Sequence, residues 1–285
     1  RRYVVLCKHC SESPRPVDGL TTGPDGPDRR TLLTGMLAVP FAAALGTGTA
    51  GATGHLRSPH TLVSGRRAEP PPIIRRSEWG GDLLPKGPLP AEDVRFLLVH
   101  HTAEPGSDYG PDESVKLLRG IYAFHTGASK GWPDVAYNFF VDKYGKVFEG
   151  RTGSFNGPIR GSATGGNQGY SQLCCFLGDF NDTPPPAPAL ESMYSLLAWL
   201  ADRYRVDTTP GAKVQFTSLG SNRWPAGSTI DAATISAHRD MSQTTCPGDA
   251  CYALVRGAFP QQVSARRAPT AADTTVPPTA APTTL

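Results

Sequence analysis

Apolar residues follow two different periods through the middle of the chain, and the pattern predicts strands that alternate with helices. Short apolar runs that indicate buried strands cover residues 94–100, 137–142, 146–149 and 173–177. Amphipathic spacing that indicates helices covers residues 112–124, 187–204 and 249–259. Because helices separate most of the strands, we predict an α/β fold: a single domain with a mixed central β-sheet flanked by helices.

The same pattern predicts which faces of two helices are buried. The expected inner stripes are Val115, Leu118 and Tyr122 in the first helix and Leu190, Met193, Leu197 and Leu200 in the longest one. Residues 143–145, Lys-Tyr-Gly, should join the second and third strands as a hairpin. We interpret the long apolar stripe as core and not as a cofactor site.

Composition changes on both sides of this domain, which we place at residues 73–262. Residues 53–72 form a linker rich in Ser, Arg, Gly and Pro that ends in three consecutive prolines. Residues 263–285 form a tail rich in Ala, Pro and Thr, with too little apolar surface to fold. We therefore expect disordered N- and C-terminal segments around one compact domain.

Residues 1–52 have features of a twin-arginine bacterial export signal behind a long polar lead. Arg29-Arg30 precede a short alanine-rich apolar stretch, and Ala50-Gly51-Ala52 offers a small-residue cleavage site. The stretch contains Pro40 and several glycines, which makes it a poor membrane-spanning helix. We expect a secreted or cell-wall protein that meets the membrane only during export; a retained membrane anchor is the alternative.

Charge and loop composition exclude two classes of ligand. The formal net charge is +3 on 285 residues and no basic stripe stands out, so we expect no nucleic-acid partner. The glycine-rich loop over residues 152–169 lacks a Gly-Lys-Ser/Thr sequence and precedes a strand, so it is not a phosphate cradle. Cys7 and Cys10 have the spacing of half a metal site, but no second pair lies nearby.

A histidine and a cysteine come close together in the stretch from 234 to 252. A β-branched pair leads into His238, a polar turn then delivers Cys246, and Pro247-Gly248 ends the turn before a helix. An imidazole at a strand end and a thiolate at a helix start can converge on one ion. Zinc accepts both ligand types, and a catalytic zinc usually has three protein ligands and one open position.

The strand over residues 94–100 offers the third ligand, because it ends abruptly in His100-His101-Thr102. Histidines at the end of a buried strand point into whatever crevice opens there. Taken alone, each histidine has a second interpretation as a hydrogen-bonded strand-end residue. Two strand ends that carry histidine, together with a cysteine, favour a metal centre.

A series of sequence blocks follows this pattern in a fixed order. The blocks are Val-His-His-Thr at 99–102, Trp-Pro-Asp-Val-Ala-Tyr-Asn-Phe at 132–139, Gly-Lys-Val-Phe-Glu-Gly-Arg at 145–151, Ala-His-Arg-Asp at 237–240 and Thr-Thr-Cys-Pro-Gly-Asp at 244–249. They resemble the peptidoglycan recognition proteins and the related zinc N-acetylmuramoyl-L-alanine amidases. Ile-Ile-Arg-Arg-Ser-Glu-Trp-Gly at 73–80 resembles the start of the same domain.

The resemblance implies a Zn²⁺ cofactor held by His100, His238 and Cys246, with His101 pointing elsewhere or hydrogen-bonding nearby. Such an ion lowers the pKa of its water from ~15.7 to ~7 and polarises an amide carbonyl. By the same resemblance Tyr137 orients the water or stabilises the oxyanion, and Thr244 hydrogen-bonds beside the metal. Taken alone, the tyrosine is equally a core residue and the threonine a turn residue.

Two departures from the family pattern bear on the mechanism. Some related amidases carry a glutamate on the strand that reads Leu-Cys-Cys-Phe-Leu here, at 173–177. Its absence makes the site resemble that of the peptidoglycan recognition subgroup, which uses a tyrosine and the zinc water. Ala163 also stands where many members have a histidine, so the resemblance does not specify the contacts with sugar and peptide.

Export to an oxidising compartment raises two disulfide alternatives. Cys174 and Cys175 are adjacent on a strand, so their side chains face opposite ways and only one faces the metal. The other is placed to pair with Cys251, which leaves Cys246 for zinc. A pairing of Cys246 with Cys251 is the rival, and it would destroy the site.

The resemblance implies a zinc amidase that cleaves the bond between N-acetylmuramic acid and L-alanine in peptidoglycan stem peptides. The signal region adds that it is exported, and we expect a monomer. The alternative is a module that binds peptidoglycan, as muramyl peptide, without cutting it. Cys246 and Tyr137 favour catalysis, because family members without the cysteine usually only bind. Wall remodelling and attack on neighbouring cells are not distinguished by the sequence.

Overall fold

The computed structural model describes residues 68–163 and 169–267. The predicted export signal, residues 53–67 of the linker and residues 268–285 of the tail lie outside the described residues. The strands of the main sheet are β1 (Ile73–Ile74), β2 (Phe96–His101), β3 (Phe139–Val141), β4 (Val147–Glu149), β5 (Ser171–Phe176) and β8 (Ile235–Ala237). The helices are α1 (Arg76–Gly80), α2 (Ser114–Thr126), α3 (Ala187–Tyr204), α4 (His238–Met241), α5 (Asp249–Arg256) and α6 (Ala258–Arg267).

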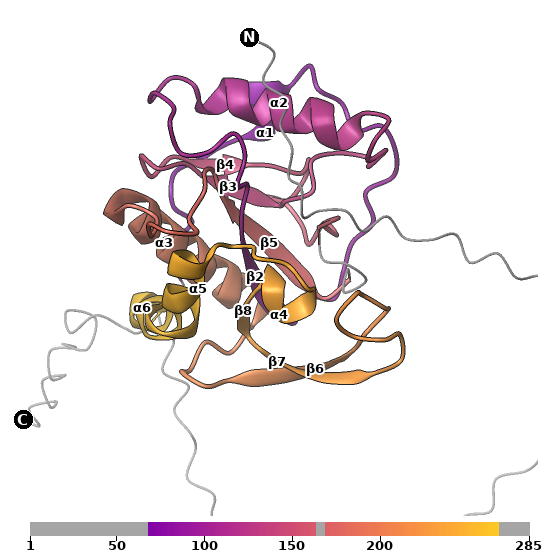
Figure 1. Ribbon diagram of the computed structural model, residues 1–285, viewed down its shortest axis with the longest axis vertical. Coiled ribbons are helices and arrows are strands. Elements are labelled where there is room, and N and C mark those ends of the chain that lie inside the picture. The colour runs from indigo at the N-terminus through magenta and orange to yellow at the C-terminus, as the bar shows by residue number, and fades with distance from the viewer. Residues whose placement is uncertain (1–67, 164–168, 268–285) are drawn as a thin grey trace, which may run out of the picture. The chain divides into compact units, whose positions relative to one another are not determined.

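The main sheet has six strands in the order β1-β4-β3-β5-β2-β8 (Figure 1). β2 lies between β5 and β8 and is parallel to both. β3 is parallel to β5 and antiparallel to β4, with which it forms the hairpin predicted around residues 143–145. The predicted mixed sheet flanked by helices is therefore confirmed, with β2 and β8 ending side by side.

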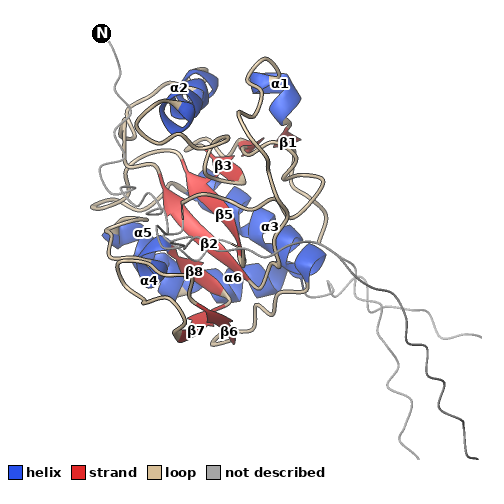
Figure 2. Ribbon diagram, turned by 90° about the vertical axis from the view of Figure 1, so that its right-hand side faces the viewer, coloured by secondary structure: helices blue, strands red, loops and turns tan. Residues whose placement is uncertain are grey.

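The sheet separates two apolar cores because successive side chains of a strand point to opposite faces. On β2, Leu97 and Val99 face a core built with α3, α5 and α6, whereas Phe96 and Leu98 face a core built with α1, α2 and α4. Figure 2 shows β5, β2 and β8 through the middle of the domain, with helices on both sides. Burial on both faces explains why these strands are continuous apolar runs in the sequence.

The predicted stripe of α3 is largely correct and that of α2 is partly wrong. α3 has the predicted bounds, and Met193, Leu197 and Leu200 are fully buried. In α2, Val115 is 37% exposed. Its neighbour Ser114 takes the inner position instead, because its hydroxyl donates to the buried carboxylate of Asp142 over 2.7 Å.

The C-terminal end of the domain differs from the prediction in two respects. The single helix expected over residues 249–259 is two helices, α5 and α6, which are separated at Gly257. α6 continues into the stretch predicted as tail, and Val263 is fully buried in the core of α3 and α5. Asp202 of α3 accepts hydrogen bonds from the Ala68 amide and from the Arg267 side chain. It therefore binds the first and the last of the described residues to α3.

A second, two-stranded antiparallel sheet was not predicted. β6 (Lys213–Thr217) and β7 (Thr229–Ala233) form a hairpin whose strands alternate exposed and buried residues within a polar stretch. Phe216 packs on Phe96 of β2, with 5.3 Å between ring centroids. Such a hairpin is marginal by itself, so its stability comes from this packing. Among the helices of the described residues, none combines the length and apolarity needed to cross a membrane.

Candidate metal centre

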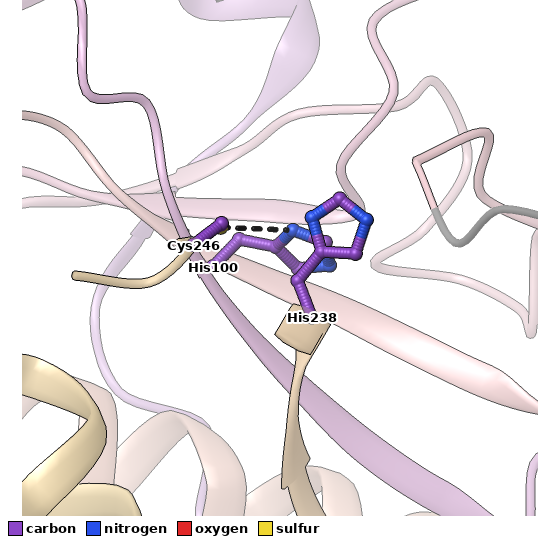
Figure 3. A group of neighbouring side chains, drawn as sticks. All are labelled: His100, His238 and Cys246. Carbon is purple, nitrogen blue, oxygen red and sulfur yellow. Dashed lines mark hydrogen bonds between the residues drawn. The ribbon is translucent and has the colours of Figure 1, made fainter. Parts of the chain in front are cut away.

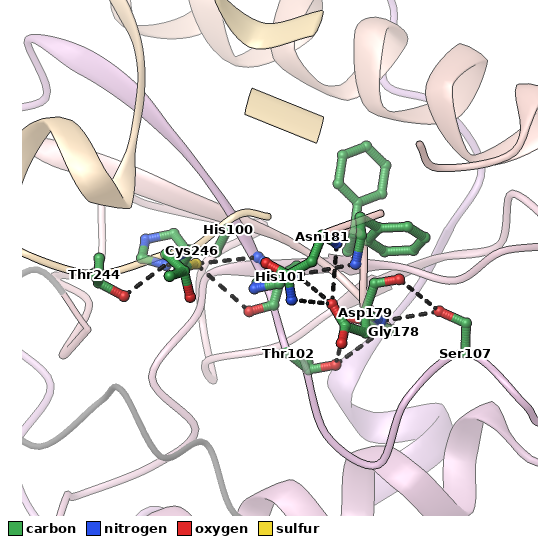
Figure 4. A network of polar contacts seen from close by, with 12 residues as sticks. His100, His101, Thr102, Ser107, Gly178, Asp179, Asn181, Thr244 and Cys246 are labelled. Atoms are coloured by element: carbon green, nitrogen blue, oxygen red, sulfur yellow. Dashed lines mark hydrogen bonds and ion pairs between the residues drawn. The ribbon is translucent and has the colours of Figure 1, made fainter. Parts of the chain in front are cut away.

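The alternation of β2 decides which of its two terminal histidines enters the site. His100 shares the parity of Phe96 and Leu98 and is fully buried on their face of the sheet. His101 turns to the opposite face, where its Nδ1 accepts a hydrogen bond from the Phe180 amide over 3.2 Å (Figure 4). The prediction that His101 points elsewhere is confirmed, and the pleat is the reason.

The parallel pairing of β8 with β2 brings His238 next to His100. Val99 pairs with Ala237, so the following residue of each strand comes to the same end of the sheet. α4 begins at His238, and the two imidazole centroids are 4.6 Å apart. Residues 138 positions apart in the sequence thus become neighbours through one strand pairing.

Cys246 reaches the two histidines from the loop after α4 (Figure 3). Its Sγ lies 3.7 Å from Nδ1 of His100 and accepts a hydrogen bond from the amide of His101 over 3.4 Å. Gly248 lets the loop pass close to the chain at Phe180: a Cβ on Gly248 would lie 2.2 Å from the Phe180 carbonyl oxygen. The close approach of two backbones therefore positions the sulfur.

The three side chains fit one metal ion. One ligand atom from each of His100, His238 and Cys246 lies within 4.8 Å of the others, and all three residues are buried. In a tetrahedral zinc site, bonds of about 2.0–2.3 Å place ligand atoms roughly 3.3–3.7 Å apart, so a modest contraction suffices. Within the described residues, His100 Nε2 and His238 Nδ1 are buried without a hydrogen-bond partner. Two buried imidazoles and a thiol are a donor set that zinc accepts.

Burial keeps both imidazoles neutral in the absence of metal. Loss of hydration lowers the pKa of His100 well below its ordinary value, and the neighbouring His238 and His101 add to the effect. Burial followed by the charge of His101 lowers the pKa of His238 to about 3. A neutral imidazole is the form that ligates a metal, so neither histidine has to lose a proton before an ion binds.

The two residues predicted to assist catalysis both lie at the cluster. Tyr137 is 2% exposed, and its ring centroid is 5.0 Å from that of His100. Thr244 accepts a hydrogen bond from the Cys246 amide through Oγ1 over 3.2 Å. The geometry thus makes Tyr137 one wall of the site and Thr244 a brace of the cysteine loop, while their catalytic roles stay predictions.

His125 is a residue of this site that the sequence analysis missed. It lies in the last turn of α2, and its Nδ1 accepts a hydrogen bond from the Ala136 amide over 3.1 Å. Its ring centroid is 4.9 Å from that of Trp132 and 5.8 Å from that of Tyr137. Burial, followed by the charges of Lys130 and Arg151, lowers its pKa to about 3. The available signal was its spacing, three residues after Tyr122 on the buried face of α2.

The cysteines outside the cluster do not compete for Cys246. No disulfide joins any two cysteines of the described residues, so neither predicted pairing is present. Cys174 and Cys251 lie in the core of α3 and α6, on the far side of the sheet from Cys175. Burial raises the pKa of Cys174, and it raises that of Cys251 to about 12, so both thiols stay protonated and unreactive.

Comparison with known proteins agrees with this geometry. Residues 90–249, more than half of the chain, match the family described as N-acetylmuramoyl-L-alanine amidase. Peptidoglycan recognition protein 1 of Bos taurus is 29% identical over 189 residues, which cover 65% of this chain and 82% of that protein. Peptidoglycan-recognition protein LE of Drosophila melanogaster is 35% identical over 127 residues, which cover 44% of this chain and 35% of that protein.

Solved structures show the same fold. The crystal structure of Drosophila peptidoglycan recognition protein SD superposes with a TM-score of 0.50 at 24% identity, over 65% of this chain and 94% of that one. Wild-type Drosophila PGRP-LB superposes with a TM-score of 0.50 at 22% identity, over 65% of this chain and 93% of that one. The chain therefore belongs to the N-acetylmuramoyl-L-alanine amidase family that includes the peptidoglycan recognition proteins.

Proposed function

We propose that this protein is a zinc-dependent amidase that hydrolyses the bond between N-acetylmuramic acid and the L-alanine of peptidoglycan stem peptides. One observation carries the proposal: two imidazoles and a thiol converge within 4.8 Å of one another in a buried cluster. Three protein ligands of these types leave one position of a tetrahedral zinc ion open for water, as in catalytic zinc sites. Family membership supplies the substrate class.

Zinc would be held by His100, His238 and Cys246, and when bound it would lower the pKa of a water molecule and polarise the scissile carbonyl. The chain's own residues prepare this site. The amide of His101 donates to Cys246 Sγ, which stabilises the thiolate form of the ligand. The hydroxyl of Thr244 accepts from the Cys246 amide, which fixes the turn that presents the sulfur.

Tyr137 is the residue we assign to charge stabilisation. Its ring is packed between His125 and Phe140, with ring centroids 5.8 Å and 5.4 Å away, so the phenol has a fixed direction. A preorganised O–H that donates to the carbonyl oxygen stabilises the negative charge that develops there in the transition state. No carboxylate from β5 takes part, because the strand reads Ser-Gln-Leu-Cys-Cys-Phe.

The second candidate function is recognition of peptidoglycan without cleavage. It is favoured by the names of the relatives, several of which are peptidoglycan recognition proteins. A tyrosine-to-phenylalanine mutant of Drosophila PGRP-LB, which shares the fold at 22% identity, has also been solved in complex with tracheal cytotoxin. Both candidates have a muramyl peptide of the cell wall as partner, and they differ only in whether the amide bond is broken.

We also propose that the protein is exported, since its substrate lies outside the cytoplasm. The support is the sequence around Arg29-Arg30 and the site at Ala50-Gly51-Ala52. Replacing both arginines with lysine in the full chain should retain the protein inside the producing cell. Unchanged secretion of this variant, measured by immunoblot of the culture medium, would refute the twin-arginine route.

The amidase proposal is tested with the full chain, purified muropeptides and mass spectrometry. We expect free stem peptide from the zinc-loaded protein, and no product after chelation or in Cys246→Ser. Cys251→Ser is the matched control, because it removes a buried thiol from the opposite core. If the zinc-loaded protein binds muropeptides and leaves them intact, the recognition function replaces the amidase.

A further inference from the structure

The tip of the β6–β7 hairpin, residues 221–224, has no part in the proposed function, yet it contacts the segment between two of the three candidate ligands. It packs on the segment from Arg239 to Gln243, which joins His238 to Cys246 along the chain (Figure 1). The hairpin is thus the neighbour of the loop that sets the separation of two of the three ligands.

α4 needs outside partners because it has only four residues, His238–Met241. The last four carbonyls of a helix have no partner within the helix. At this end, Met241 O accepts from the Ser221 hydroxyl over 2.8 Å, and Asp240 O accepts from the Trp224 indole N–H over 2.9 Å. The hairpin tip therefore caps a helix that begins with a metal ligand.

Two further side chains extend this contact along the loop. The guanidinium of Arg223 donates to Arg239 O over 3.1 Å. The amide of Asn222 bridges Gln243 in both directions: its Nδ2 donates to the carbonyl over 3.3 Å, and its Oδ1 accepts from the amide over 2.6 Å. The Asn222 side chain thereby pairs with the loop as a neighbouring strand would.

Hydrogen bonds within the tip hold its own backbone in one conformation. The hydroxyl of Ser221 accepts from the amides of Arg223 and Trp224 over 3.2 Å and 2.9 Å, and the Ser221 amide donates to Trp224 O over 2.8 Å. The strand that leads to the tip is held in place by Phe216, which packs on Phe96 of the strand that carries His100. One rigid hairpin thus links the strand of the first ligand to the loop of the other two.

The other side of the loop is held by residues near Cys246 itself. The Arg239 amide donates to Cys246 O over 3.1 Å, and the Arg239 side chain donates to Thr245 O and pairs with Asp249. These bonds close the loop upon itself. The outward carbonyls of Arg239, Asp240, Met241 and Gln243 accept hydrogen bonds from the hairpin tip instead.

We infer that Ser221, Asn222, Arg223 and Trp224 are positioning residues of the metal centre, which hold His238 and Cys246 at the separation that one ion requires. The inference rests on the proposed function in one respect: the centre must hold zinc. Without these bonds the loop is ordered only when the ion binds, and that ordering costs affinity. Loss of partners that orient metal ligands typically weakens metal binding by about 10–100-fold. We expect the lower end, about 10-fold, because the hairpin acts through the backbone of the loop.

The test uses the full chain and the variants Trp224→Phe, Asn222→Ala and their combination. Trp224→Phe keeps an aromatic ring at this position and removes the indole N–H donor, while the side chain of Asn222 is exposed and its loss leaves no cavity. Trp199→Phe is the matched control, since it makes the same change on α3 in the opposite core. The readouts are the zinc dissociation constant from competition with a chromogenic chelator, the absorption spectrum of the cobalt-substituted protein, and the melting temperature of the metal-free protein.

The expected result is a zinc dissociation constant about 10-fold higher in the double variant, with an altered cobalt spectrum, while Trp199→Phe retains the wild-type constant. Asn222→Ala decides the matter if Trp224→Phe unfolds. If the double variant binds zinc as tightly as Trp199→Phe, the inference is wrong and the amidase proposal stands. If Trp224→Phe unfolds, the same conclusion follows when Asn222→Ala binds zinc as tightly as Trp199→Phe. If the wild-type protein binds no zinc, the proposed function fails and the inference fails with it.

Discussion

Gly248, two residues after Cys246, offers the sharpest test of how the fold presents the cysteine. Its φ is +90°, in the region that favours glycine, and an added Cβ would meet the Phe180 carbonyl oxygen at 2.2 Å and the Asn181 amide nitrogen at 2.6 Å. Both contacts are with backbone, so neither is relieved by turning a side chain. The substitution Gly248→Ala should therefore move one of the two chains.

Two terms add up in the cost of Gly248→Ala. The backbone of Gly248, with φ +90° and ψ 151°, lies in a region nearly reserved for glycine and costs an alanine about 1–3 kcal/mol, and the forced contact costs about 1–3 kcal/mol, as in overpacked cores. Gly211 separates these terms, because its φ is +88° and an added Cβ would meet nothing within 4 Å. Gly211→Ala should lose only the first term, so the two variants should differ by about 1–3 kcal/mol.

The assay is urea unfolding of the metal-free full chain, with the zinc dissociation constant measured on the same samples. Gly248→Ala should unfold at a lower urea concentration than Gly211→Ala, and it alone should bind zinc more weakly, because relief of the contact displaces Cys246. Equal unfolding midpoints and equal zinc affinities in the two variants would refute the idea that the contact with Phe180 positions the sulfur.

Three further substitutions test other parts of the structure. Tyr137→Phe should lower kcat by about 10²-fold with unchanged zinc content, if its hydroxyl stabilises the oxyanion; activity equal to wild type would remove Tyr137 from the mechanism. Burial raises the pKa of Glu92 from 4.5 to about 8, so the folded protein holds a proton that the unfolded chain releases. The stability this provides is complete below about pH 4.5 and is lost as the pH rises through about 8, so the urea midpoint of Glu92→Gln should fall less than that of wild type over this range; parallel pH profiles would contradict the assignment. Asp202→Asn should lower the free energy of unfolding by about 1 kcal/mol, less so at high salt, because the carboxylate binds the Ala68 amide and the Arg267 side chain; a salt-independent loss would exclude the ion pair as its cause.

Local sequence predicted the elements whose apolar period is strong. The observed positions of β2, the β3–β4 hairpin and α3 follow the predicted ones. The strands are continuous apolar runs because both faces are buried, and α3 carries a long apolar stripe because one face is buried. β6 and β7 were missed because only alternate positions such as Phe216 are apolar, within a polar stretch. Val115 was placed in the core because local spacing does not record that Ser114 has a buried partner in Asp142.

The candidate ligands were also predicted from sequence, for a physical reason. His100 lies at the end of one apolar strand, His238 directly follows another, and Cys246 precedes a helix, so the local sequence predicts their places at the ends of these elements. What no local pattern states is the pairing of β2 with β8, which brings the two imidazole centroids to 4.6 Å. His125 was missed for the same reason: it lies on a different helix and meets Tyr137 only in the packed domain.

The sequence by itself thus determined the α/β class, the long elements and the residue types able to hold a metal, because these depend on periodicity and on side-chain chemistry. The family resemblance implied His100 over His101, and the tertiary structure gave the physical reason for it. The tertiary structure alone decided that Cys251 stays apart from Cys246 and that the tip at residues 221–224 caps α4. These outcomes depend on pleat parity, strand pairing and the need of buried carbonyls for partners. Each of them joins segments that lie far apart in the chain.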